Sequence, residues 1–340
     1  MSTAETATDT SGAGGGQRPG APLAARGGGI AVLAERAALP VAWIVLIIIY
    51  SITSPGLFLT WSNISNILGS QAVLFVLALA ALMPSFTGDF DLSLGGVMGL
   101  TAMVVGVLNT RHGVGILPAC LIAVAVAVVA GCLNGFFVVT CDTNALIVTL
   151  GMGSVFTGLI YFLAGSNTIT GIGESLSTYT FTTKMLGIPV EFYYGLALMM
   201  LVWYVSTFTP LGLRALFVGQ SRDVARLSGI RVARIRWGGF VLGGLVAGLA
   251  GILFVGTTGS ADPTASAPYL LPAYAAVFLG ATTLKPGRFN ALGVGIAVYF
   301  LATGVNGLQL HGAANYVQQL FYGAALIAAV VLSRQLRRRA

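Results

Sequence analysis

The sequence predicts an all-α integral membrane protein with about ten transmembrane helices, some of them broken or re-entrant. The chain of 340 residues is 56% hydrophobic and only 8% charged, whereas a soluble domain carries about 25% charged residues. Its apolar stretches are continuous and do not alternate with polar residues, which favours helices over a membrane β-barrel. So few charged groups cannot cover a water-facing surface, and lipid must therefore be the main solvent of this chain.

The apolar segments divide the chain into three parts. Residues 1–38 are polar and rich in Gly, Ala and Thr, so they predict a disordered cytoplasmic tail. Residues 39–333 form the predicted transmembrane domain, and 334–340 form a basic cytoplasmic tail. The ten apolar segments are about 39–53, 64–86, 92–110, 115–139, 145–165, 191–209, 237–257, 269–284, 290–306 and 314–333. A spanning helix needs about 20 apolar residues, so the short segments 269–284 and 290–306 leave a re-entrant pair open as an alternative.

The basic residues orient these segments in the membrane. With the N-terminus inside, the cytoplasmic segments are 1–38, 87–91, 140–144, 210–236, 285–289 and 334–340. These segments hold 15 of the 17 Lys and Arg residues, and only Arg111 and Lys184 fall outside them. Short loops rich in Lys and Arg resist translocation, so both termini are predicted to face the cytoplasm. The stretch 166–190 then becomes the longest outer loop.

The run TGDFDLSLGG places two acids at a predicted membrane boundary. It can be a proton or cation relay, or a fixed break between two helices. The break is favoured because a glycine relaxes the backbone and Asp91 or Ser93 can cap the helix that follows. A relay usually needs acids deeper in the bundle, and no predicted span has an acid at its midpoint. The residues of this helix-break motif are Gly88, Asp89, Asp91 and Ser93.

Polar residues inside the predicted spans are mostly neutral amides and hydroxyls. Most such groups serve helix packing through hydrogen bonds between helices. A path lined by them, without buried charge, would suit a neutral polyhydroxylated solute better than an inorganic ion. The candidate path residues, chosen by polarity and depth, are Gln71, Asn134, Asn306 and Gln309.

Several other classes of function lack support in the sequence. The net charge of +7 comes from basic residues at predicted membrane edges, so no nucleic-acid partner is expected. The sequence has no GxxxxGK[ST] motif, and the chain is therefore not expected to bind ATP through a P-loop. The Cys and His residues do not have metal-ligand spacing, so no metal site is predicted. No nucleophile and base stand out as a catalytic pair, and enzyme activity is not expected.

The loop 210–236 is strongly basic, and the stretch SRDVARLS within it predicts a short helix. Ser221 is its expected N-cap, Asp223 lies in the first turn and Arg226 near the last, which matches the helix dipole. Gly229 supplies a stop.

This short helix would be amphipathic, because Val224 and Leu227 share one face. Two interpretations follow from the residues alone. The helix can insert into the groove of a cytoplasmic partner, or the loop can lie on anionic lipid headgroups.

Several motifs of the chain resemble those of a known family. The run GDFDLSLGG is similar to the GGIDLSVG signature of the permease subunits of ribose/xylose/galactose-type ATP-binding-cassette importers. The stretch 131–166, the basic loop, AGLAGIL (247–253) and NGLQLHG (306–312) resemble further blocks of that family, so that the resemblance covers about residues 40–333. The chain departs from the family where Asp89 and Phe90 replace Gly and Ile, and where GATTLKPGRFN replaces GGTSLxGGxG.

The resemblance implies a permease subunit that moves a sugar or similar polyol across a bacterial cytoplasmic (inner) membrane by alternating access. Two permease subunits, identical or different, would pair with two cytoplasmic ATPases, which would hold the ATP and Mg, and this chain would carry no cofactor. An extracytoplasmic solute-binding protein would deliver the sugar. The resemblance also implies an ATPase-coupling role for Gly219, Ser221, Arg222, Asp223, Ala225, Arg226 and Gly229.

Three alternatives remain open. A branched-chain amino-acid permease of similar architecture would carry a zwitterion, and charged groups in the path would favour it. An ion-coupled secondary transporter would need no ATPase, but the lack of midspan acids and the docking-type loop disfavour it. A membrane anchor without transport activity is the third.

Overall fold

All ten predicted apolar segments form helices in the computed structural model, which describes residues 29–339. The long helices are α1 (Gly29–Thr53), α5 (Ile116–Gly135), α6 (Ala145–Ala164), α8 (Val190–Phe208), α11 (Val232–Thr258), α13 (Ala291–Leu310) and α14 (Asn315–Arg339). The shorter helices are α2 (Trp61–Ser70), α3 (Ala72–Ser85), α4 (Leu94–Gly106), α7 (Glu174–Ser177), α9 (Pro210–Gln220), α10 (Arg222–Leu227) and α12 (Leu270–Gly280). Eight helical segments are long and apolar enough to cross a membrane, and two shorter apolar helices add to them among the described residues. The prediction of an all-α membrane protein is confirmed.

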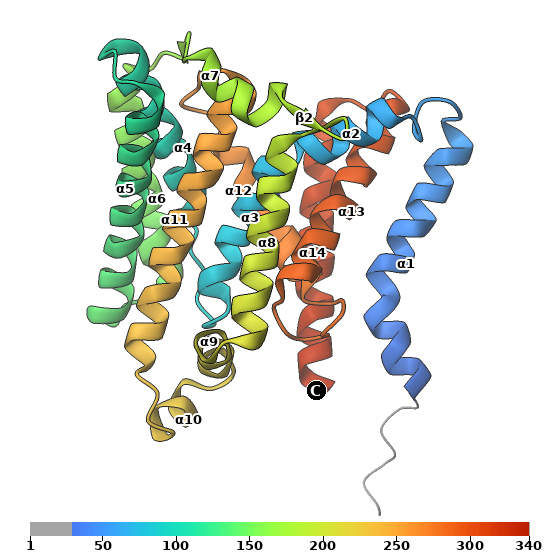
Figure 1. The fold of residues 1–340 in the computed structure, drawn as a ribbon. Helices are drawn as coiled ribbons and strands as arrows, with labels where there is room; N and C mark the ends of the chain where they lie inside the picture. The colour runs from blue at the N-terminus through green and yellow to red at the C-terminus, as the bar shows by residue number, and fades with distance from the viewer. Residues whose placement is uncertain (1–28, 340) are drawn as a thin grey trace, which may run out of the picture.

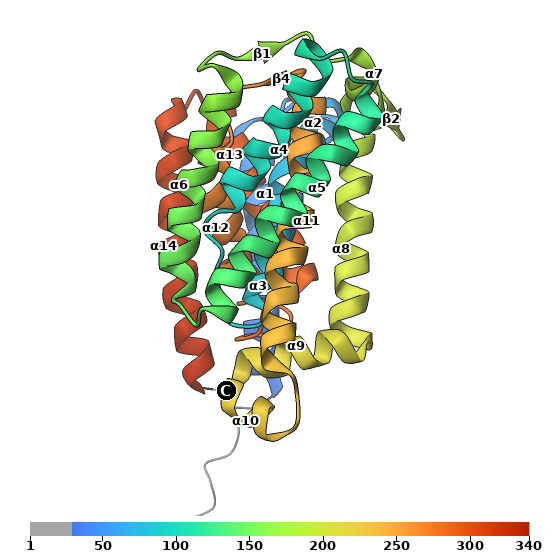
Figure 2. The same ribbon diagram turned by 90° about the vertical axis from the view of Figure 1, so that its left-hand side faces the viewer.

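The helices run side by side between two ends of the bundle (Figures 1 and 2). At one end lie α9, α10 and the last turns of α14, and this is called the α10 end below. At the opposite end, β1 (Ile169–Thr170) pairs with β4 (Ser260–Ala261), and β2 (Lys184–Met185) pairs with β3 (Ile188–Pro189). The loop 166–190 therefore lies at the end of the bundle opposite the basic loop.

The structure differs from the prediction at both boundaries of the transmembrane domain. Helix α1 begins at Gly29, so the part of the predicted disordered tail from 29 to 38 is helical. The sequence AVLAERAAL explains this, because Ala, Leu, Glu and Arg are strong helix formers. For the same reason α14 continues through RQLRRR to Arg339 and leaves no separate tail there. The predicted disorder of 1–28 lies outside the described residues.

Two of the predicted spans are interrupted or shortened. The segment 64–86 breaks at Gln71, which separates α2 from α3. The segment 269–284 becomes the short α12, preceded by the 3-10 turn η4 (Ala267–Tyr269). By contrast α13 is 20 residues long, so a re-entrant pair is wrong for this helix. It continues past residue 306 to Leu310, and the Asn306 side chain hydrogen-bonds to Asn63 of α2.

The centre of the bundle is built around α3 and α11. Every residue of α3 is buried, as expected for a helix that is apolar on all sides. Helix α11 packs closely on α5 and α4 through glycines. A methyl group added to Gly244 would lie 2.6 Å from the Ala127 carbonyl oxygen, and one added to Gly251 would overlap the Met98 carbonyl oxygen. Small residues thus allow close helix approach where no hydrophobic drive exists between helices.

Candidate functional site

The basic loop folds into the predicted short helix, α10. Ser221 caps it, since its Oγ accepts a hydrogen bond from the Val224 N–H at 3.4 Å. Asp223 lies in the first turn and Arg226 in the last turn. Gly229 has a φ of +78°, which an L side chain rarely adopts and which ends the helix. The local prediction is confirmed, while the ATPase-coupling role of these residues stays a prediction.

One face of α10 is fixed to the body of the protein. Ala225 is completely buried and forms a small apolar cluster with Val218 of α9 and Val232 of α11. The predicted coupling role of Ala225 does not include a direct side-chain contact with a partner, because its side chain has no exposed surface in the described structure. Its small size instead lets α10 pack closely against the two neighbouring helices.

The other face of α10 is open. Leu227 is 88% exposed and Val224 is 49% exposed, and the Arg226 side chain is exposed beside them. Helix α10 lies at the lower edge of the molecule, next to α9 and beyond the ends of the long helices (Figures 1 and 2). A leucine this exposed, on a short anchored helix, is a suitable anchor for a partner surface.

The helix-break motif forms a tight turn between α3 and α4. Gly88 has a φ of +77°, which confirms the predicted relaxed backbone. Helix α4 begins at Leu94, and the Ser93 side chain makes no capping hydrogen bond. Instead Asp91 Oδ1 accepts hydrogen bonds from the Ser93 N–H at 2.9 Å and the Ser93 hydroxyl at 2.6 Å. Of the two predicted caps, Ser93 stands at the N-cap position but its hydroxyl donates to Asp91, and Asp91 accepts from the Ser93 N–H just before the helix begins.

Asp91 and the neighbouring Leu92 fasten this turn to three other helices. Asn134 of α5 donates to Asp91 Oδ2 at 3.1 Å. The Tyr274 hydroxyl of α12 accepts from the Asp91 N–H at 2.8 Å and lies 2.9 Å from the Asp91 carbonyl oxygen, to which it donates. Thr149 of α6 accepts from the Leu92 N–H at 2.9 Å. Burial raises the pKa of the Asp91 carboxyl, and the hydrogen bonds from Ser93 and Asn134 oppose that change.

Asp89 connects the same turn to the basic loop. Its carboxylate is 3% exposed and forms a two-pronged ion pair with Arg236 of α11, at 2.8 Å to Nε and 2.9 Å to Nη2. Arg222 of α10 adds a third contact, 2.8 Å from Nη2 to Oδ1. Gly219 allows the end of α9 to lie directly against this turn, because a side chain at this position would overlap the Phe86 carbonyl oxygen. The coupling residues and the helix-break motif thus form one connected structure.

The sequence did not predict these ion pairs. It indicated the excess of Arg in the loop and the acid at the boundary, but it gave no register between segments far apart in the chain. Arg222 was assigned as a partner contact, and the structure turns its guanidinium toward Asp89.

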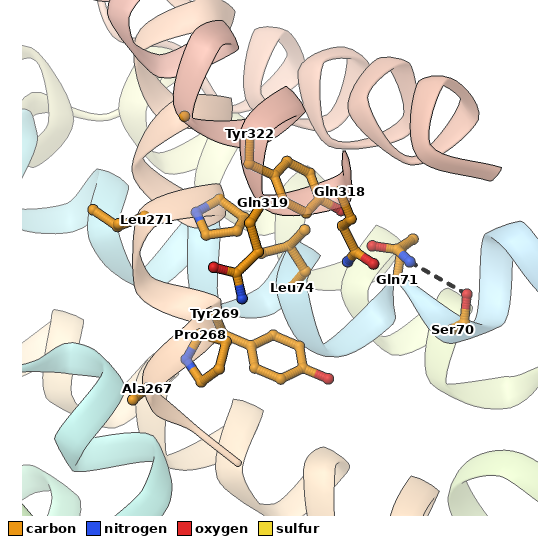
Figure 3. Close-up of a pocket in the computed structure, with 12 residues that line it drawn as sticks. Ser70, Gln71, Leu74, Ala267, Pro268, Tyr269, Leu271, Gln318, Gln319 and Tyr322 are labelled. Carbon is orange, nitrogen blue, oxygen red and sulfur yellow. Dashed lines mark hydrogen bonds between the residues drawn. The ribbon is translucent and has the colours of Figure 1, made fainter. Parts of the chain in front are cut away.

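A cavity of about 590 Å³ lies among α2, α3, α12 and α14, near the break between α2 and α3. Its polar lining consists of Ser70, Gln71, Tyr269, Gln318, Gln319 and Tyr322. In Figure 3 the amide groups of Gln71 and Gln318 point toward one another. Cavities of this size hold small polar molecules in other proteins.

The four predicted path residues do not come together. Gln71 lines the cavity, and Gln309 lies at its edge, 3.4 Å from the Oε1 of the lining residue Gln318. Asn306 forms a pair of 3.1 Å hydrogen bonds with Asn63 of α2, which is helix packing. Asn134 is completely buried with Asp91, away from the cavity.

One buried acid was not among the site residues predicted from the sequence. Glu191, in the first turn of α8, is completely buried. Its Oε2 lies 2.5 Å from the Thr257 hydroxyl, and its Oε1 has no hydrogen-bond partner among the described residues. The residue stands at the edge of a predicted span, where an acid is usually solvated. Across residues 29–339 no group of three His, Cys, Asp or Glu could hold a metal ion.

A bundle of helices long enough to span a membrane, with a polar cavity between them and a partly open helix at one end, is the arrangement expected of a membrane transport protein. The chain belongs to the family described as "branched-chain amino acid transport system / permease component", whose model matches residues 63–330. It is thus the permease component of a transport system and a multi-pass membrane protein.

Several curated proteins are similar to it over most of their length. The ribose import permease protein RbsC of Bacillus subtilis (strain 168) is 34% identical over 86% of this chain and 90% of its own. The D-allose transport system permease protein AlsC of Escherichia coli (strain K12) is 28% identical over 85% and 89%. The autoinducer 2 import system permease protein LsrD of Photorhabdus luminescens is 30% identical over 75% and 78%. No solved structure matches the chain.

Proposed function

We propose that this chain is the permease subunit of an ATP-binding-cassette importer that brings a sugar or similar polyol into the cytoplasm. A separate cytoplasmic ATPase, a second permease subunit and an extracytoplasmic solute-binding protein complete the importer. The α10 end, both termini included, faces the cytoplasm of a bacterial inner membrane. The observation that carries this proposal is the open face of α10, on a helix fixed to the turn between two membrane helices.

The sugar is favoured over an amino acid by the cavity. Its polar lining consists of neutral amide and hydroxyl groups, without a charged side chain among the residues that line it. A zwitterion would leave its ammonium and carboxylate groups without ionic partners in such a cavity, and unpaired charges are costly wherever they lose contact with water. The similarity to permeases named for ribose and D-allose points the same way.

The cavity also supplies the proposed solute path. Gln71 and, through Gln318, Gln309 contribute amide groups that can donate to and accept from sugar hydroxyls. Tyr269 adds an aromatic ring and a hydroxyl to the same lining. Alternating access requires that the ATPase and the binding protein each prefer one of two conformations, because a ligand shifts an equilibrium only by its differential affinity.

Docking of the ATPase is tested by co-purification. The permease carrying Arg226→Glu and Leu227→Asp is expressed with its candidate ATPase and compared with wild type. We expect wild type to retain the ATPase and the double variant to lose it while remaining monodisperse in detergent. Lys184→Glu, an exposed charge reversal at the opposite end of the bundle, is the matched control and should retain the ATPase. Retention by the double variant would place docking elsewhere.

The energy source and the solute are tested together in proteoliposomes. Uptake of radiolabelled ribose, allose and leucine is measured with the ATPase and binding protein present, with and without ATP. We expect ATP-dependent uptake of a sugar and none of leucine. Uptake driven by an ion gradient without the ATPase would support the secondary-transporter alternative, and ATP-dependent uptake of leucine would support the amino-acid alternative.

A further inference from the structure

The Arg222 side chain does not belong to the open face of α10. It is 41% exposed, and its guanidinium reaches inward to Asp89, 2.8 Å from Nη2 to Oδ1. Arg226, one turn later on the same helix, is exposed and has no ion pair among the described residues. Two arginines four positions apart therefore have different surroundings, and only Arg222 connects α10 to another part of the bundle by charge.

Asp89 is shared unequally between its two arginines. The Arg236 side chain is 10% exposed and binds the carboxylate with two nitrogens, so this contact is enclosed and directional. The contact with Arg222 is single and lies at the edge of the solvent. Arg236 thus holds the carboxylate in place, and Arg222 is the one that joins a separate helix to it.

The turn that carries Asp89 is firmly held on its other side. Two residues further on, the Asp91 cluster fastens the turn to α5 through Asn134 and to α12 through Tyr274. The backbone of Gly219 lies directly against Phe86 at the start of the turn. A displacement of Asp89 therefore cannot be absorbed by a loose loop and must reach α4, α5 and α12.

We propose that Arg222 and Asp89 form a positioning pair that transmits movement of α10 to the turn between α3 and α4. This inference rests on the proposed function, since it assigns the route by which ATPase closure reaches the membrane helices. The family signature GGIDLSVG has Gly at the position of Asp89. The ion pair between Arg222 and Asp89 is therefore a feature of this chain. Coupling of this kind can be carried by a chain of packed and ion-paired residues between the two sites, and the ion pair supplies one link of it.

The test measures the number of solute molecules moved per ATP hydrolysed in proteoliposomes that contain the ATPase and the binding protein. Arg222→Gln keeps a hydrogen-bonding side chain and removes the charge. We expect this variant to retain bound ATPase but to move fewer solute molecules per ATP, by about fivefold or more. Arg234→Gln, an exposed arginine near the start of α11, is the matched control and should keep the wild-type ratio.

A double-mutant cycle separates a coupled pair from two independent effects. Asp89→Asn retains the shape of the side chain but also weakens the contact with Arg236, and Asp89→Asn combined with Arg222→Gln should lower the transport ratio no further than Asp89→Asn alone. Thermal melting of each variant in detergent shows that the fold is kept. Because Arg222→Gln leaves the contact between Asp89 and Arg236 intact, it remains informative even when Asp89→Asn is unstable.

Each result decides a different point. If Arg222→Gln binds the ATPase and keeps the wild-type ratio, the pair is structural only and the inference fails, while the proposed function stands. If Arg222→Gln loses the ATPase, Arg222 acts at the docking surface and the inference also fails. If wild type itself binds no ATPase, the proposed function fails, and this inference, which rests on it, fails as well.

Discussion

At the scale of single residues, Asp89 and Asp91 show how two acids of one motif can be satisfied differently. Asp89 is neutralised by cationic side chains, and Asp91 is held by neutral donors from Ser93 and Asn134. The sequence predicted that this motif breaks the helix, because Gly and Asp there are local signals. It could not predict the partners, because Arg222 and Asn134 reach the motif only after the helices have packed.

Removing the Asp89 carboxylate should destabilise the protein strongly. In Asp89→Ala, Arg236 keeps its buried charge without a partner, which costs about 3–5 kcal/mol. The measurement is the thermal or denaturant midpoint in detergent, followed by tryptophan fluorescence. Asp223→Ala, which removes an exposed acid from α10, serves as the control and should change the midpoint little. Asp89→Ala combined with Arg236→Met should recover part of the loss, and the absence of any recovery would argue against the ion pair as the cause.

Glu191 should tolerate removal of its charge. The Thr257 hydroxyl lies within hydrogen-bond distance of both the Glu191 carboxyl and the Leu253 carbonyl oxygen, and it has one proton to give. Glu191 has no cationic partner among the described residues, so an ionised carboxylate would be costly there. We expect Glu191→Gln to melt at the same temperature or higher, and Glu191→Ala to melt lower. A clear loss of stability in Glu191→Gln would show that the charge itself is needed.

At the scale of elements, glycines on one face of α11 decide how closely it packs. A methyl group at Gly248 would lie 2.6 Å from the Cβ of Ala127, whereas one at Gly238 has open space around it. The same substitution should therefore have opposite effects on one helix. Gly248→Ala should lower the free energy of unfolding by roughly 1–3 kcal/mol through overpacking, and with it the melting temperature. Gly238→Ala should leave it unchanged or raise it, because Ala is a better helix former than Gly. Equal effects at both positions would contradict this packing.

The sequence predicted some elements better than others. Helix α10 carries its own signals, Ser221 at the start and Gly229 after the end, and was predicted closely. The break at Gln71 was not predicted, although Gly69 and Ser70 precede it, because small residues are also common inside membrane helices, where they serve close packing. Helix α2 is set by tertiary packing instead, with Gly69 in close contact with Pro189 of β3. Elements with local capping signals can be predicted from sequence, and those positioned by packing cannot.

At the scale of the whole molecule, the distribution of Lys and Arg predicts which end faces the cytoplasm. Single cysteines at Leu227 and Lys184, in a chain whose three native cysteines are replaced, test this. A membrane-impermeant maleimide added to intact spheroplasts should label Lys184→Cys readily. It should label Leu227→Cys only after the membrane is permeabilised, because this position lies at the opposite end, which the basic residues predict to be cytoplasmic. The reverse pattern would invert the topology and place α10 out of reach of a cytoplasmic ATPase.

The composition of the chain predicted the class of the whole protein, but it did not predict which residues line the cavity. Few charges and long apolar runs are enough to indicate a helical membrane protein, because both follow directly from transfer into lipid. The cavity lining joins residues of α2, α12 and α14 that are far apart in the chain. Of the predicted path residues, only Gln71 was placed in that lining, since polarity alone does not reveal which face of a helix is open.

The nearly complete exposure of Leu227 also bears on how the cell treats an unassembled copy. A subunit made in excess of its ATPase would display an apolar side chain to the cytosol, the kind of surface that chaperones and proteases recognise. We therefore expect the chain to be shorter-lived when expressed alone than with its partner, as measured by the decay of a tagged copy after synthesis is stopped. Replacing Leu227 with Ser should lengthen that lifetime, so that one exposed leucine would tie the abundance of the permease to the supply of its ATPase.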